Sequence, residues 1–183
     1  MQKNDITPFL STINRYIAAK DNNKPHLLSQ VFTQQATLSM QVNTDGISFP
    51  SDVVGRHAIS DVLVSQFNQT YENIYTFCLS DSIDRNGSLL ACKWLVAMTE
   101  KESGNLKVGC GHYDWEFQSE DGSSVKKLSI TIKHMFTLDF QNTAHFLHGL
   151  SELPYPWCFS SSARIEMPAI PALQDIRTFL DQI

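Results

Sequence analysis

Apolar residues in the first third of the chain recur at helical spacing. A second short helix is predicted after Asn23, with Pro25 in its first turn, and a third is predicted to open at Val54–Ile59. The first helix would be capped by Asp5 and end at Asn22. Its predicted apolar face is Ile6, Phe9, Leu10, Ile13, Tyr16 and Ile17, and that of the third helix is Ile59, Val62, Leu63 and Phe67.

The spacing then changes to the alternation that is typical of strands. Leu38, Met40 and Val42 alternate with polar residues. Longer strand-like runs follow, and turns with Gly87, Gly104 or Gly122 join them, which predicts an antiparallel meander. These runs cover residues 71–83, 88–99, 107–118 and 128–140.

The pattern weakens beyond Gln141, where four prolines interrupt the chain. A last short helix is predicted from Pro171 to Ile183. We therefore expect one α+β domain over residues 1–140 and a C-terminal extension over residues 141–183, packed on the same domain.

Composition narrows the class of protein. The 183 residues are 42% hydrophobic and 18% charged, with a net charge of −5, which excludes a disordered chain. The isoelectric point near 5.6 argues against nucleic-acid binding. No run is long and apolar enough for a membrane span, and no secretory signal is recognisable, so a cytoplasmic location is expected. The four cysteines are widely spaced, and no motif predicts a metal or another cofactor.

Three segments, taken in order, resemble a known superfamily. They are Phe32–Met40 after the second helix, Val54–Ile59 at the third, and Gly111–Phe117 in a late strand. Their order and spacing resemble the nuclear transport factor 2-like superfamily, which has a cystatin-like α+β fold and includes SnoaL-like cyclases and ketosteroid isomerase. The resemblance implies a curved antiparallel sheet, mixed at its edge, that wraps around the N-terminal helices as a cone. It also implies an apolar pocket in the cone and a homodimer formed through the outer face of the sheet.

The aromatic residues predict where a ligand would bind. On the strand after Gly111, Tyr113 and Trp115 share one face, and His112 and Asp114 share the other. We expect the aromatic face to line the pocket, although the reverse would place an acid–base set there. A small apolar or aromatic ligand is the expected partner. The expected pocket residues are Tyr16, Met40, Phe67, Tyr75, Trp94, Tyr113 and Trp115.

One histidine is a candidate for catalysis. Alternation places His134 in the apolar row Leu128–Phe140, where an imidazole could act as a general base. A core histidine that pairs with one side chain is the alternative. Arg56 and His57 open a helix and could attract an anion or be solvated. The resemblance implies polar pocket residues near the end of the first helix, where Tyr16 and Asp21 lie, but no motif gives them a catalytic role.

These observations leave three functions open. The leading hypothesis is a small-molecule-binding cone protein, with activity as a cofactor-independent isomerase, dehydratase or cyclase acting through His134. The second is a module that binds a ligand or dimerises without catalysis, because no acid and base pair at one site. The third is the small subunit of an oxygenase, which would form a complex with a larger iron-containing chain.

Overall fold

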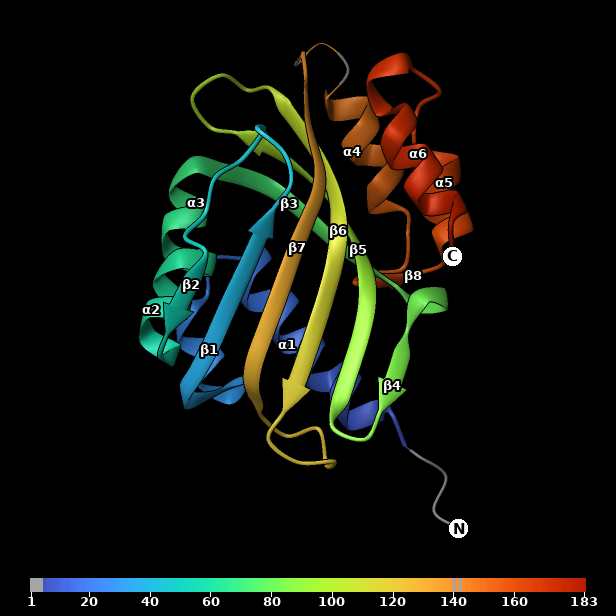
Figure 1. The fold of residues 1–183 in the computed structure, drawn as a ribbon. Helices are drawn as coiled ribbons and strands as arrows, with labels where there is room; N and C mark the ends of the chain where they lie inside the picture. The colour runs from blue at the N-terminus through green and yellow to red at the C-terminus, as the bar shows by residue number, and fades with distance from the viewer. Residues whose placement is uncertain (1–4, 140, 142) are drawn as a thin grey trace.

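A curved mixed sheet of eight strands organises the computed structural model, which describes residues 5–139, 141 and 143–183 (Figure 1). The strand order is β2-β1-β7-β6-β5-β3-β8, and β4 pairs with β5. Pairing is parallel between β1 and β7 and between β3 and β8, and antiparallel elsewhere. The bounds are β1 Phe32–Val42, β2 Asp52–Val54, β3 Tyr71–Leu79, β4 Asp84–Asn86, β5 Leu89–Glu100, β6 Leu106–Phe117, β7 Val125–Leu138 and β8 Trp157–Cys158.

The N-terminal helices lie against one face of this sheet, which we call the inner face. Asp5 accepts a hydrogen bond from the Thr7 backbone N–H at 3.0 Å just before the first helix, whose N-cap position is Ile6 and not the predicted Asp5. Buried apolar side chains of the first helix pack against Tyr113, Trp115 and Phe117. The helical elements are α1 Thr7–Asp21, η1 Pro25–Gln30, α2 Arg56–Ser60, the π-helical η2 Asp61–Gln66 and α3 Phe67–Thr70.

Two β-bulges, one in β3 and one in β7, reverse the face of the sheet to which the later side chains of each strand point. Asn73, with φ of 50°, is an extra residue in β3, so Thr76 points to the inner face and Tyr75 to the outer face. In β7, Ile132 pairs with Gly111 and His134 with Cys110, so Lys133 is extra. The prediction that His134 shares a face with Ile132 is therefore wrong, because one inserted residue moves every later side chain to the opposite face. Phe140, the end of that predicted row, lies outside the described residues.

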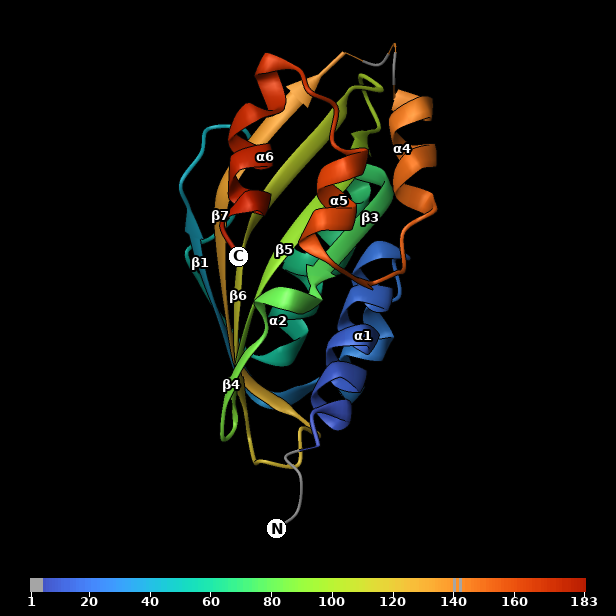
Figure 2. The same cartoon turned by 90° about the vertical axis from the view of Figure 1, so that its right-hand side faces the viewer.

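The C-terminal extension covers the upper part of the outer face (Figure 2). Its elements are α4 Thr143–Ser151, β8, α5 Ser160–Glu166, η5 Pro171–Leu173 and α6 Gln174–Asp181. The buried side chains of these helices pack on Leu95, Ala97 and Val108, which point away from α1. A second apolar core thus lies on the face through which the resemblance implies a homodimer.

The predicted α+β class with a curved sheet, mixed at its edge, is confirmed. No helix in the described ranges is both long and apolar enough to cross a membrane. The extension contains more structure than the single predicted helix, because its prolines separate short elements that have no long periodic pattern of their own.

Candidate functional site

A narrow cavity lies between the inner face of the sheet and the helices. The space that the centre of a water molecule can occupy in this cavity has a volume of about 50 Å³. Since about 10–15 Å³ is enough for one water molecule, the cavity takes a few waters or a slim ligand, and side chains fill the rest of the cone. Its wall is mostly apolar, with polar groups from Tyr16, Lys20, Thr76, Trp94 and Tyr113.

Five of the seven expected pocket residues line this cavity, namely Tyr16, Met40, Phe67, Trp94 and Tyr113. Trp115 lies behind them, with its ring centroid 5.1 Å from that of Tyr16 and 5.4 Å from that of Tyr113. Tyr75 lies on the outer face, where its ring stacks on Phe77 at 6.4 Å, so it does not reach the cavity. The bulge at Asn73 is the reason.

Gly111 makes room for the ring of Trp94. A Cβ at position 111 would lie 2.8 Å from Trp94 Cζ2 and 1.8 Å from the Thr131 backbone oxygen. The absence of a side chain on β6 therefore lets the indole of Trp94 lie across the inner face and border the cavity.

Two hydrogen-bond donors at the cavity are unpaired. The Tyr16 hydroxyl and the Trp94 indole Nε1 are buried and have no partner among the described residues. Burial raises the pKa of Tyr16, and the neighbouring Tyr113 side chain opposes part of that rise, so the Tyr16 hydroxyl keeps its proton and is available as a donor. Burial likewise raises the pKa of Tyr113, whose ring centroid lies 5.9 Å from that of Tyr16 and 5.7 Å from that of Trp94.

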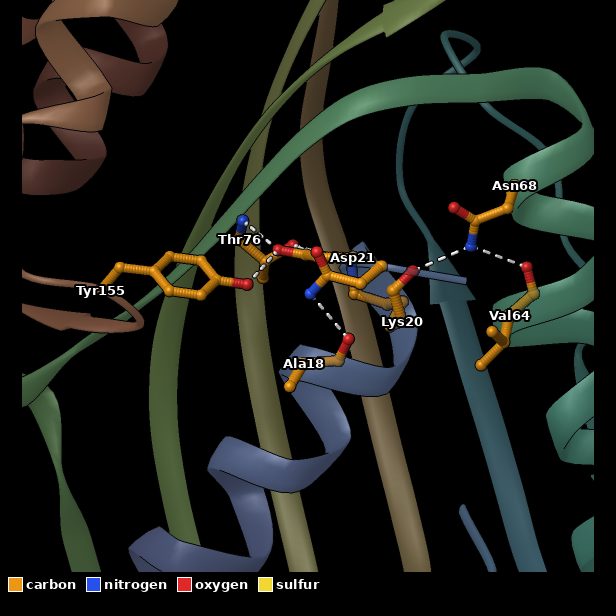
Figure 3. A network of polar contacts seen from close by, with 8 residues as sticks. Ala18, Lys20, Asp21, Val64, Asn68, Thr76 and Tyr155 are labelled. Atoms are coloured by element: carbon orange, nitrogen blue, oxygen red, sulfur yellow. Dashed lines mark hydrogen bonds and ion pairs between the residues drawn. The ribbon is translucent and has the colours of Figure 1, made fainter. Parts of the chain in front are cut away.

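An ion pair lies at the end of α1 (Figure 3), and its lysine, Lys20, also lines the cavity. Lys20 Nζ lies 2.7 Å from Asp21 Oδ1 and donates to Thr76 Oγ1 at 2.7 Å. The side chains of Lys20 and Asp21 are 8% and 2% exposed. Asn68 donates to the Lys20 carbonyl and to the Val64 carbonyl, both at 2.8 Å, which fixes this helix end to the neighbouring helical segment. Lys20 is thus a buried cation with a fixed position in the cavity wall.

Asp21 has all its acceptor capacity occupied by the protein. It accepts from Lys20, from the Thr76 backbone N–H at 2.7 Å, from Thr76 Oγ1 at 2.8 Å and from the Tyr155 hydroxyl at 2.8 Å. A carboxylate at the C-terminus of a helix faces the negative end of the helix dipole. Four donors offset that repulsion and hold the carboxylate in one orientation.

Tyr155 brings the C-terminal extension to this cluster. Its ring packs edge-on against Tyr75 and Phe77, at centroid distances of 6.4 and 5.9 Å. Next to it, Trp157 Nε1 donates to Asn14 Oδ1 at 2.6 Å, and Trp157 pairs with Cys78 in the sheet. The extension is therefore joined to α1, although none of its described residues lines the cavity.

Sequence reasoning missed Lys20, Thr76 and Tyr155. A lysine in the last turn of a helix is usually exposed, and the bulge at Asn73 reverses the face of Thr76. Tyr155 belongs to an irregular segment whose contacts are more than a hundred residues away. The one signal was the resemblance, which pointed to Tyr16 and Asp21 at the end of the first helix.

The other candidates lie elsewhere. His134 is on the outer face, stacked on Phe136 at 5.8 Å, and does not line the cavity. Arg56 donates to the Phe32 carbonyl at 3.3 Å, and His57 is exposed. His145 and His148 are exposed on α4. No group of three or more His, Cys, Asp or Glu side chains within the described ranges could hold a metal ion.

Solved structures of other proteins share the fold of this chain. No family model matches the chain, and no curated protein matches it. A Bacillus subtilis protein provisionally described as an isomerase is 11% identical, with a TM-score of 0.57 over 69% of this chain and 87% of that one. A type 2 hexachlorocyclohexane dehydrochlorinase (LinA) is 12% identical, with a TM-score of 0.56 over 72% and 87%. A Catenulispora acidiphila protein with a ketosteroid isomerase-like fold, in complex with trimethylamine, is 14% identical, with a TM-score of 0.53 over 65% and 82%. Identities this low establish a shared fold and no activity.

Proposed function

We propose, from the nuclear transport factor 2-like fold that this chain has, that the protein binds a slim apolar molecule with a hydrogen-bond acceptor oxygen. The observation that carries the proposal is the pair of unpaired donors, Tyr16 and Trp94, at a mostly apolar cavity. A buried donor without a partner costs about 1–3 kcal/mol, which a ligand oxygen would recover. The Lys20 ammonium in the same wall favours an oxygen with partial negative charge, such as that of a ketone.

Binding without catalysis accounts for the cavity better than proton transfer does. An isomerase, dehydratase or cyclase of this kind needs a base that can reach the ligand. The described residues that line the cavity include no Asp, Glu, His or Cys. Asp21 is adjacent, but its carboxylate is 2% exposed and already accepts from Lys20, Thr76 and Tyr155.

The test compares two ligands of nearly the same shape. Cyclohexanone and methylenecyclohexane differ in the acceptor oxygen, and NMR titration that follows the Trp94 indole N–H reports both affinity and hydrogen bonding. We expect cyclohexanone to bind about tenfold more tightly, the effect of one hydrogen bond to an otherwise unpaired donor. Its binding should shift the Trp94 indole proton downfield.

Matched variants locate the effect. Tyr16→Phe and Trp94→Phe should each reduce the preference for the ketone. Trp115→Phe removes a buried indole N–H that is also unpaired but does not line the cavity, so the preference should persist. Equal affinity of the wild type for the two ligands would contradict the proposal.

The catalytic alternative has its own measurement. The α-protons of cyclohexanone exchange with deuterium when a base removes them, and ¹H NMR in D₂O follows the loss of signal. A binding protein should leave this exchange at its rate in buffer. Acceleration by the wild type that Tyr16→Phe abolishes would establish proton-transfer catalysis in the cavity instead.

A further inference from the structure

A second hollow lies on the far side of the loop that joins β1 to β2. The space that the centre of a water molecule can occupy in this hollow is about 200 Å³, compared with about 50 Å³ in the ligand cavity. Ile47, Phe49 and Phe67 line both hollows. These three side chains are therefore the partition between the cavity and the outer hollow, and two of them belong to the loop.

The loop is held firmly before and after the partition. Lys107 Nζ donates to the Gly46 carbonyl at 2.8 Å, and the Met40 backbone N–H donates to the Ser51 carbonyl at 2.7 Å. Gly46 also lies so close to β7 that a Cβ there would be 2.3 Å from the Met135 backbone oxygen. These contacts fix both ends of the segment formed by residues 47–50.

The segment between these ends has no comparable hold. No hydrogen bond joins residues 47–50 to another residue in the described part of the chain. Phe49 instead stacks on Phe67, with ring centroids 6.4 Å apart and ring planes at 24°. Side-chain packing alone therefore keeps the partition closed, and such packing opens at lower cost than a hydrogen-bonded strand.

We propose that residues 47–50 form a gate through which the ligand reaches the cavity, and that Phe49 limits the size of ligand admitted. The inference rests on the proposed function in that the cavity is the binding site. Rotation of Phe49 away from Phe67 would join the two hollows and admit a ring larger than the closed cavity holds. Lys107 acts as a positioning residue: its hydrogen bond to the Gly46 carbonyl holds the segment in the closed position and is given up when the gate opens, and its side chain lines neither hollow.

The experiment measures access to the cavity without a ligand. Acrylamide, a small neutral quencher, is applied to a chain in which Trp94 is the single tryptophan, through Trp115→Phe and Trp157→Phe. Trp94 is 4% exposed and lines the cavity, so its quenching reports how readily a small molecule enters the cavity. In this background Lys107→Met should raise the bimolecular quenching constant about fivefold, the factor for loss of one ordinary hydrogen bond from the closed state. Phe49→Ala should raise it at least as much.

The control is Val62→Ala, which alters the outer hollow alone and should leave quenching unchanged. Circular dichroism establishes that each variant is folded. If Lys107→Met has the same quenching constant as the single-tryptophan chain from which it is made, residues 47–50 do not open and the inference is wrong. This holds even if Phe49→Ala raises the constant, because loss of the ring alone can create an opening. Because acrylamide replaces the ligand, failure of cyclohexanone to bind would contradict the proposed function and leave this measurement unaffected.

Discussion

Within the described part of the chain, the Tyr16 hydroxyl lacks a hydrogen-bond partner, which a ligand would supply. This hydroxyl is buried, so Tyr16→Phe should raise the free energy of unfolding of the ligand-free protein by about 1 kcal/mol. The same change should weaken ketone binding. Urea denaturation with and without cyclohexanone measures both effects. A loss of stability in the empty protein would mean that the hydroxyl has a partner in solution.

His112 makes a pH-dependent contact between the sheet and the extension. Its ring lies 5.4 Å from that of Phe179 on α6. Burial lowers the pKa of His112, Lys93 and Lys133 lower it further, and Asp114 opposes them. The folded pKa is below the unfolded value of about 6.5, so this contribution to stability is complete above that pH and is lost as the pH falls through the folded pKa.

We therefore expect His112→Gln to lessen the fall in the free energy of unfolding between about pH 7.5 and about pH 5. Urea denaturation at a series of pH values measures the slope. His145→Gln is the control, because His145 is exposed on α4. A slope equal to that of the wild type would show that His112 keeps its unfolded pKa in the folded protein.

At the scale of elements, η2 changes which residues of the third helical segment are buried. The π-helical turn is wider than an α-helical one, so the buried positions along α2, η2 and α3 step by four. They are Ile59, Ser60, Leu63, Val64, Phe67 and Asn68. The predicted stripe followed α-helical spacing and so included Val62, which is partly exposed, in place of Val64.

Val64→Ala should therefore destabilise the protein more than Val62→Ala. Val64 is fully buried, and loss of its methyl groups should cost about 2 kcal/mol, against less than about 1 kcal/mol at Val62. Thermal and urea unfolding of the two variants measure the difference. A regular α-helix in solution would reverse the order.

Strand alternation predicted the inner face of β5 and β6 and failed on parts of β3 and β7. Trp94, Tyr113 and Trp115 lie on regular stretches, and their faces are as expected. Tyr75 and His134 follow bulges, which place an extra residue where no glycine, proline or break in the pattern marks it. The positions of bulges depend on tertiary packing, so alternation alone could not locate them.

At the scale of the whole molecule, the extension changes what the outer face can do. It buries the apolar residues of β3, β5 and β6 that a partner subunit would need. The remainder of that face is polar, as at Asp114, Lys127 and Thr131. Stable homodimers bury apolar surface.

We therefore expect the full chain to be a monomer of 20.7 kDa, although the resemblance implies a homodimer. Light scattering after size-exclusion chromatography at micromolar concentration measures the mass. Twice that value would show that another surface, or the polar part of the outer face, mediates dimerisation.

The cone was predictable because helical and strand periods are strong in residues 6–138, whereas the path of the extension was not. Its elements are short, and their partners are distant in sequence. The resemblance pointed to Tyr16 and Asp21 near the end of the first helix, and neither it nor the periodicity pointed to Tyr155, which completes that cluster.

The bond between Tyr155 and Asp21 has a consequence for synthesis. The two residues are 134 positions apart, and Trp157 and Asn14 are 143 apart. A ribosome must therefore make most of the chain before α1 receives its last partners, and closing so long a loop is entropically costly. Until then Leu95 and Val108 lack their cover, so an incomplete chain exposes an apolar sheet face on which it can aggregate. The extension is translated after the sheet and is thus the part that covers this apolar face.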